Sequence, residues 1–69
     1  NGLGAVGELG LTGEVRPVKQ IEKRIKEFEK MGLKECLVPE ANNIDPKSYE
    51  IKVIPVQSIR EIASRFIKQ

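Results

Sequence analysis

The chain has no histidine and no tryptophan, and it has a single cysteine among its 69 residues. Without histidine, it lacks the side chain that most often acts as a general base near neutral pH. One cysteine excludes an internal disulfide, and the lack of histidine excludes a Cys/His zinc site. Cys36 lies in an apolar run with Leu37 and Val38, so we interpret its thiol as buried and inert. We therefore expect neither a cofactor nor a metal in this segment.

Aromatic residues and long apolar runs are also scarce. Aromatics make up 4% of the chain, so the core has to be built from isoleucine, leucine and valine. No apolar run approaches the length of a membrane span and no signal peptide is recognisable, so we expect no membrane partner. The net charge of +2 is too balanced to indicate a nucleic-acid binder by itself. A chain this short buries little surface, and we expect a fragment of a larger domain or a protomer completed by partners.

No catalytic or nucleotide-binding motif stands out. The run from Gly2 to Gly7 matches G-x-G-x-x-G, but Gly10 and Gly13 exclude the helix that a phosphate site requires directly after it. Glu8 and Glu14 flank a turn, and we interpret both as solvated or capping carboxylates. The serines have no histidine to activate them, and nothing in the sequence selects a lysine partner for any of them. We therefore predict no catalytic residue.

The hydrophobic pattern predicts a small α/β (α+β) fold with one mixed sheet and two helices, in the order β-β-α-β-β-α. The expected strands are residues 5–9, 14–18, 34–39 and 50–56, and the expected helices are residues 20–31 and 58–68. A strand, a helix and a strand within about 25 residues are typical of a βαβ unit, so we expect strands 14–18 and 35–38 to run parallel. Residues 40–49 read as a polar loop.

Both helices have an apolar face and a recognisable end. The first carries a stripe of four residues and should stop at Gly32, with Leu33 folding back on it; the stripe is Ile21, Ile25, Phe28 and Met31. The second begins with a capping-box pattern, Ser58 and Glu61. Its expected buried face is Ile59, Ile62, Ala63, Phe66 and Ile67.

Four lysines of the first helix, with spacings of four, three and four, form a basic line. They are Lys19, Lys23, Lys26 and Lys30. At 100° per residue they fall within roughly 60° of one another, opposite the apolar stripe. Such a line can follow a row of phosphates. Glutamates flank it, however, and Glu22 is well placed to pair with Lys26. A solvated helix face and a phosphate-contacting face both remain open.

The sequence resembles the C-terminal Lon-protease-like domain of the bacterial RadA family of DNA-repair proteins, also called Sms. The resemblance rests on the run G-E-L-G-L-T-G-E-V-R-P-V at residues 7–18. It continues with I-E-K-R at 21–24, G-L-K at 32–34 and V-P at 38–39. Residues 1–4 match poorly. The resemblance implies that residues 1–69 are about the C-terminal half of a Lon-like domain.

The related Lon proteases use a Ser–Lys catalytic pair, and the resemblance implies that this chain has lost it. The Lon lysine falls on Glu22 here, and a carboxylate cannot replace an amine beside a serine nucleophile. Lys23 is adjacent but rotated by about 100° around the helix. The Lon serine would lie before residue 1. The resemblance therefore implies a non-catalytic domain, with a remnant of a Ser–Lys peptidase as an alternative.

What the resemblance implies about function comes from the whole family. Its members are cytoplasmic proteins with a zinc motif and a RecA-like ATPase core, and they drive branch migration in homologous recombination. Zinc and ATP with magnesium would bind upstream of this segment, while the Lon-like domain would support a homo-oligomeric ring and contact DNA. Our candidate DNA contacts are Arg16, Lys19, Lys23, Lys26 and Lys30. A module for oligomerisation alone is the other alternative.

Overall fold

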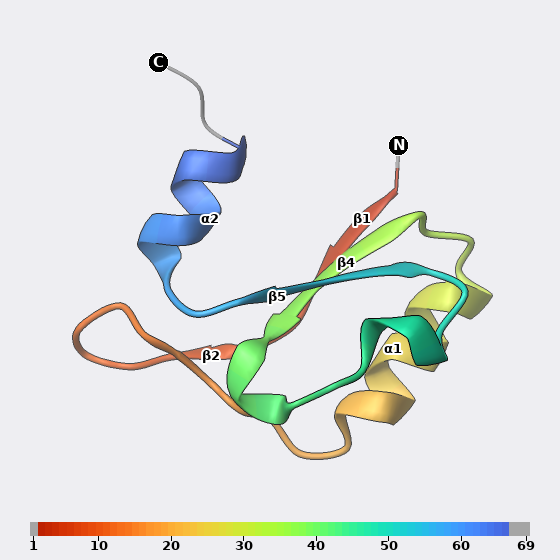
Figure 1. The fold of residues 1–69 in the computed structure, drawn as a ribbon, viewed down its shortest axis with the longest axis horizontal. Helices are drawn as coiled ribbons and strands as arrows, with labels where there is room; N and C mark the ends of the chain where they lie inside the picture. Colours follow the sequence, from red (N-terminus) through yellow and green to blue (C-terminus); the bar gives the residue numbers. More distant parts are fainter. Residues whose placement is uncertain (1, 67–69) are drawn as a thin grey trace.

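The computed structural model describes residues 2–66, which form two small sheets and two helices (Figure 1). The larger sheet is parallel, with the order β1-β4-β5; its strands are β1 (Leu3–Ala5), β4 (Glu35–Pro39) and β5 (Lys52–Val56). An antiparallel hairpin consists of β2 (Glu8–Leu9) and β3 (Val15–Arg16). The helices are α1 (Ile21–Lys30), after β3, and α2 (Ile59–Phe66), after β5. The predicted α/β class is confirmed.

The strand pairing at the N-terminal end differs from the prediction. Strand β3 pairs with β2 and not with β4, and it is β1 that runs parallel to β4. The expected strand at residues 5–9 is divided between β1, which ends at Ala5, and β2. The N–H of Val6 still donates to Leu37 O (3.1 Å), and after this bond the chain leaves the parallel sheet. The N–H of Val15 then donates to Gln57 O (2.7 Å), which ties the hairpin to the end of β5.

Strand β4 is the centre of the molecule because its side chains alternate between two apolar clusters. Cys36 and Val38 lie in the first cluster with Ile21 and Ile25 of α1. Leu37 points to the other face, where the second cluster consists of Val15, Leu37, Ile54 and Val56. Figure 1 shows α1 and α2 on opposite sides of the sheet, one over each cluster. The predicted burial of Cys36 is confirmed, with no exposed surface.

Helix α1 begins and ends close to the predicted positions. Gln20 precedes it in the left-handed region (φ 57°), and Gly32 follows its end with φ 80°. The N–H of Leu33 donates to Phe28 O (3.2 Å), the predicted fold-back after the helix. Met31 was expected in the apolar stripe but is 69% exposed. It occupies the C-cap, after the last residue of α1.

Helix α2 is less buried than its sequence predicts. Ile62 packs on the second cluster, but Ile59 and Phe66 are 47% and 44% exposed. None of the eight residues of α2 is buried, and Ile62 packs on the cluster as a partly buried residue. The predicted residues Ile67 and Lys68 lie outside the described part of the chain.

The start of α2 and the loop before β5 are held by local hydrogen bonds. Ser58 Oγ accepts from Glu61 N (3.2 Å) as predicted, while the Glu61 carboxylate accepts from Gln57 N (2.8 Å), one residue before the expected donor. The loop contains two short 3₁₀ turns, η1 (Glu40–Asn42) and η2 (Pro46–Ser48). None of the helices in residues 2–66 is long and apolar enough to cross a membrane.

Candidate nucleic-acid interface

Three of the predicted lysines lie on the outer face of α1. Lys23, Lys26 and Lys30 are all exposed, whereas Ile21 and Ile25 on the opposite side of the helix are buried. At 1.5 Å per residue, the seven residues from Lys23 to Lys30 rise about 10 Å along the helix. Successive phosphates of one DNA strand are about 3.4 Å apart along the duplex axis. This line of charges therefore matches the rise of about three phosphates.

Lys19 does not continue this line. The helix begins at Ile21, and the left-handed conformation of Gln20 turns the preceding chain away from the helical path. Lys19 instead lines a surface depression between the hairpin and α1, together with Arg24 and Glu8. The prediction of four collinear lysines is wrong for this residue, because its spacing was counted as though the helix extended back to it. The other cation that lines this depression is Arg24, which the spacing of the lysines does not predict.

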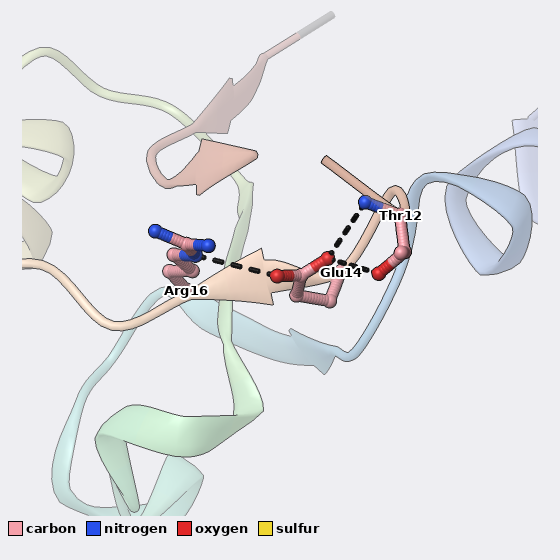
Figure 2. A network of polar contacts seen from close by, with 3 residues as sticks. All are labelled: Thr12, Glu14 and Arg16. Carbon is pink, nitrogen blue, oxygen red and sulfur yellow. Dashed lines mark hydrogen bonds and ion pairs between the residues drawn. The ribbon is translucent and has the colours of Figure 1, made fainter. Parts of the chain in front are cut away.

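Arg16 belongs to a different contact, a network in the hairpin that is centred on Glu14 (Figure 2). Its Nε donates to a carboxylate oxygen of Glu14 at 3.3 Å. The other oxygen of Glu14 accepts from the Thr12 N–H (3.1 Å) and from the Thr12 hydroxyl. The charge of Arg16 is thus partly offset, although 57% of its side chain remains exposed.

The Glu14 carboxylate also depends on the glycine that faces it. A Cβ added at Gly10 would lie 1.8 Å from a Glu14 carboxylate oxygen, so only glycine leaves room for this arrangement. Hydrogen bonds, first from the Thr12 side chain, lower the pKa of Glu14 from 4.5 to about 2. Of the two interpretations of this carboxylate, solvated or capping, the Thr12 contacts match the second.

Of the three glutamates on α1, Glu29 is directed away from the outer lysines, while Glu22 and Glu27 are exposed. The Glu29 carboxylate accepts from the backbone N–H groups of Glu50 (2.8 Å) and Ile51 (3.2 Å), at the start of β5. Burial, and then the negative charges of Glu22 and Glu29, raise the pKa of Tyr49. Both carboxylates therefore lie on the side of α1 that faces Tyr49. The predicted Glu22–Lys26 ion pair is not formed; among residues 2–66 the ion pairs are Glu14–Arg16 and Glu61–Arg65.

Asn42 fixes the segment that carries Lys19. Its side-chain oxygen accepts from Val18 N (3.1 Å), and its side-chain nitrogen donates to Val18 O (2.9 Å). The amide thus satisfies both backbone groups of Val18 in the way that a neighbouring strand would. From the sequence, Asn42 is only part of a predicted polar loop, because Val18, to which it bonds, lies 24 residues away along the chain.

Two serines at α2 and the thiol of Cys36 are further polar groups of the described chain. Ser58 caps α2, and the Ser64 hydroxyl donates to Glu61 O (3.0 Å). Burial, with a smaller contribution from Glu29, raises the pKa of the Cys36 thiol, which favours the neutral form. Residues 2–66 contain no group of three or more His, Cys, Asp or Glu side chains that could hold a metal ion.

Comparison with known proteins shows similarity to bacterial DNA repair proteins. The chain is 48% identical over 58 residues to "DNA repair protein RadA" of Bacillus subtilis, a match that covers 81% of this chain. It is 47% identical over 64 residues to the RadA of Streptococcus pneumoniae and 35% identical over 60 residues to that of Escherichia coli, each covering 87% of this chain. No protein-family model matches the sequence.

The match covers only a small part of each relative. The aligned regions are 12%, 14% and 13% of the lengths of these three proteins. The resemblance to RadA that the motifs indicate is thereby confirmed for this segment. The assignment of the segment to a Lon-like domain stays a prediction.

Proposed function

Since the chain is homologous to a segment of bacterial RadA DNA repair proteins, we propose that it is a non-catalytic module of such a protein, supporting assembly and contacting DNA. The single observation that carries this proposal is the identity of 48% and 47% to two RadA proteins across more than four fifths of the chain. The proposed cellular role is DNA repair.

We place the proposed DNA contact on the outer face of α1. Lys23, Lys26 and Lys30 are exposed and follow the rise of a phosphate row. The Glu29 carboxylate is bound to the backbone N–H groups of Glu50 and Ile51, just before β5, whereas Glu22 and Glu27 remain exposed beside the lysines. Lys19 and Arg16 extend the positive charge towards the hairpin, and Arg16 contributes less because Glu14 faces it.

We further propose that the complete protein is an ATP-dependent DNA motor that drives branch migration as a ring. ATP with magnesium, and zinc, would bind to parts of that protein outside residues 1–69. The chemistry of ATP hydrolysis would belong to those parts, and the role of this module would be to hold DNA and neighbouring subunits.

DNA binding at several salt concentrations tests the proposed contact. Replacing Lys23, Lys26 and Lys30 with glutamine in the full-length protein should weaken DNA binding. It should also reduce the slope of log K against log salt by roughly 2 to 3, because each phosphate contact contributes about 0.7 to 0.9. The matched control is the triple substitution of Lys34, Lys47 and Lys52, exposed lysines on other elements, with the same loss of charge. Equal affinity and slope for the two triple variants would reject the α1 contact.

A module for oligomerisation alone is the second candidate, favoured by the exposed apolar side chains of Ile59 and Phe66. It predicts that the lysines are dispensable for DNA binding while changes to apolar surface disrupt assembly. A remnant of a Ser–Lys peptidase is the third. The resemblance places the Lon lysine at Glu22, whose carboxylate cannot act as that amine, and a full-length protein without peptidase activity would reject this candidate.

A further inference from the structure

Two basic side chains share a depression at the start of α1. The depression lies between the hairpin and the helix, has a volume of about 560 Å³ and is lined by Gly7, Glu8, Pro17, Val18, Lys19 and Arg24. Lys19 belongs to the segment before the helix, and Arg24 belongs to α1 itself. Both are exposed, and among residues 2–66 neither has a carboxylate within ion-pair distance. Their charges are therefore open to a ligand from solvent.

The backbone that carries these two residues is held in place. Asn42 bonds to both backbone groups of Val18, the residue before Lys19. The N–H of Arg24 donates to Gln20 O (3.2 Å), within the first turn of α1. A pair of cations on a fixed backbone loses less conformational freedom when it binds a ligand than a pair on a mobile loop. The depression is therefore preorganised on its basic side.

The depression continues the line of charge that Lys23, Lys26 and Lys30 form on α1. Arg24 directly follows Lys23, and one residue is a step of about 100° around the helix. Since Arg24 lines the depression, this step leads from the outer face of α1 towards the hairpin. The exposed cations thus follow α1 from Lys30 to Lys23 and then turn towards Lys19. A DNA strand on this path meets the depression directly after the lysines.

We propose that Lys19 and Arg24 form a subsite for one backbone phosphate of DNA, next along the strand to the phosphates that the α1 lysines contact. Arginine presents a planar fork of N–H donors that can bind two oxygens of one phosphate, and lysine adds a compact positive charge. The proposal rests on the DNA contact proposed above and adds Arg24 to it. It also makes Glu8 an opposing charge in the same subsite.

The net charge of the lining favours a phosphodiester over a free phosphate. Two cations and Glu8 give a net charge of +1 (2 − 1). Each phosphate of a DNA strand carries one negative charge. A phosphomonoester near neutral pH carries a larger negative charge, about 1.5 to 2. The single net charge of the subsite therefore matches the diester of a DNA backbone.

The DNA affinity of the full-length protein at several salt concentrations tests the subsite. Arg24→Gln should weaken binding and reduce the slope of log K against log salt by about 0.7 to 0.9, the share of one phosphate contact. The loss should be equal for oligonucleotides of different base sequence, because backbone contacts carry no sequence information. Arg60→Gln removes the same charge from an exposed arginine of α2 and should leave the slope unchanged. Arg24→Lys should keep the slope but bind DNA less tightly than the unsubstituted protein.

Glu8→Gln tests the same subsite in the opposite direction. It removes the carboxylate that opposes the phosphate, so DNA binding at low salt should become roughly two- to fivefold tighter. A loss of folding cannot produce tighter binding, so this result decides even if Arg24→Gln does not fold. Glu50→Gln, at an exposed glutamate outside the depression, is the control and should not tighten binding.

Three results would overturn the subsite: equal salt slopes for Arg24→Gln and Arg60→Gln, a loss that varies with base sequence, and an unchanged affinity for Glu8→Gln. A fourth is inorganic phosphate, at constant ionic strength, abolishing the difference between Arg24→Gln and the unsubstituted protein, since the subsite would then take the free ion. The triple lysine variant of α1 separates the two proposals. If it weakens binding while Arg24→Gln does not, only the subsite fails. If it binds DNA like its control, the α1 contact fails and the subsite fails with it.

Discussion

Replacing Asn42 with alanine removes both hydrogen bonds between η1 and the segment that joins β3 to α1. Each such bond contributes about 1 kcal/mol, and the backbone groups of Val18 are partly buried, so the expected loss is about 2 kcal/mol. A chain of this length has a total stability of roughly 3 to 10 kcal/mol. The substitution should therefore remove a large share of it and lower Tm by about 8 to 16 °C.

Urea unfolding followed by far-UV circular dichroism measures this loss directly. Asn42→Asp should also be less stable than the unsubstituted chain. Its carboxylate can still accept from Val18 N, but it places a negative oxygen opposite Val18 O, where the amide of Asn42 donates. Glu40→Ala, an exposed change on the same turn, is the control and should stay within about 0.5 kcal/mol. A loss below about 0.5 kcal/mol for Asn42→Ala would refute the reasoning that this amide joins the two segments.

Three further predictions concern backbone conformation and pH. The pKa of Glu14 in the folded chain, about 2, lies below its ordinary 4.5, so its contribution to stability is present above about pH 4.5 and is lost as pH falls towards 2; Glu14→Gln should make urea stability less dependent on pH in that window. Gly10→Ala should displace the carboxylate and return its pKa, measured by NMR titration, towards 4.5, and an unchanged pKa would contradict the role given to Gly10. Gln20→Gly should raise the free energy of unfolding by about 0.5 to 1 kcal/mol, because Gln20 has φ 57°, a conformation that glycine adopts without steric cost. Gln57→Gly, the same change at an exposed residue without positive φ, should not stabilise the chain in the same urea experiment.

The elements that the sequence predicts well are those with a repeating pattern. Helix α1 was predicted to within a residue at each end, because Ile21, Ile25 and Phe28 recur at helical spacing and Gly32 supplies a stop. Strand β5 (Lys52–Val56) lies within the predicted strand at residues 50–56, and its apolar residues divide between the two clusters, with Val53 in the first and Ile54 and Val56 in the second. In both cases the pattern is local and spans several residues, so neighbours along the chain are sufficient to define it.

The features that the sequence does not predict depend on contacts between distant segments. Strands β1, β2 and β3 have only two or three residues each, too few for alternation to appear, and their partners are set by tertiary contacts. The double hydrogen bond of Asn42 and the position of Arg24 beside Lys19 likewise arise only after folding. Of the four lysines that the periodicity places on one line, the three on α1 share an exposed face in the structure. Lys19 does not continue the line, because the left-handed residue Gln20 lies between it and the helix.

The parallel sheet imposes an order on folding. Leu3 pairs with Glu35 across 32 positions (35 − 3), whereas Glu35 pairs with Lys52 across 17 (52 − 35). Closing the longer loop costs roughly 0.6 kcal/mol more chain entropy. The pairing of β4 with β5 is also longer, at five residues against three. The β4–β5 pair therefore forms early and β1 joins late, so the free side of β4 is open to another chain until β1 closes it.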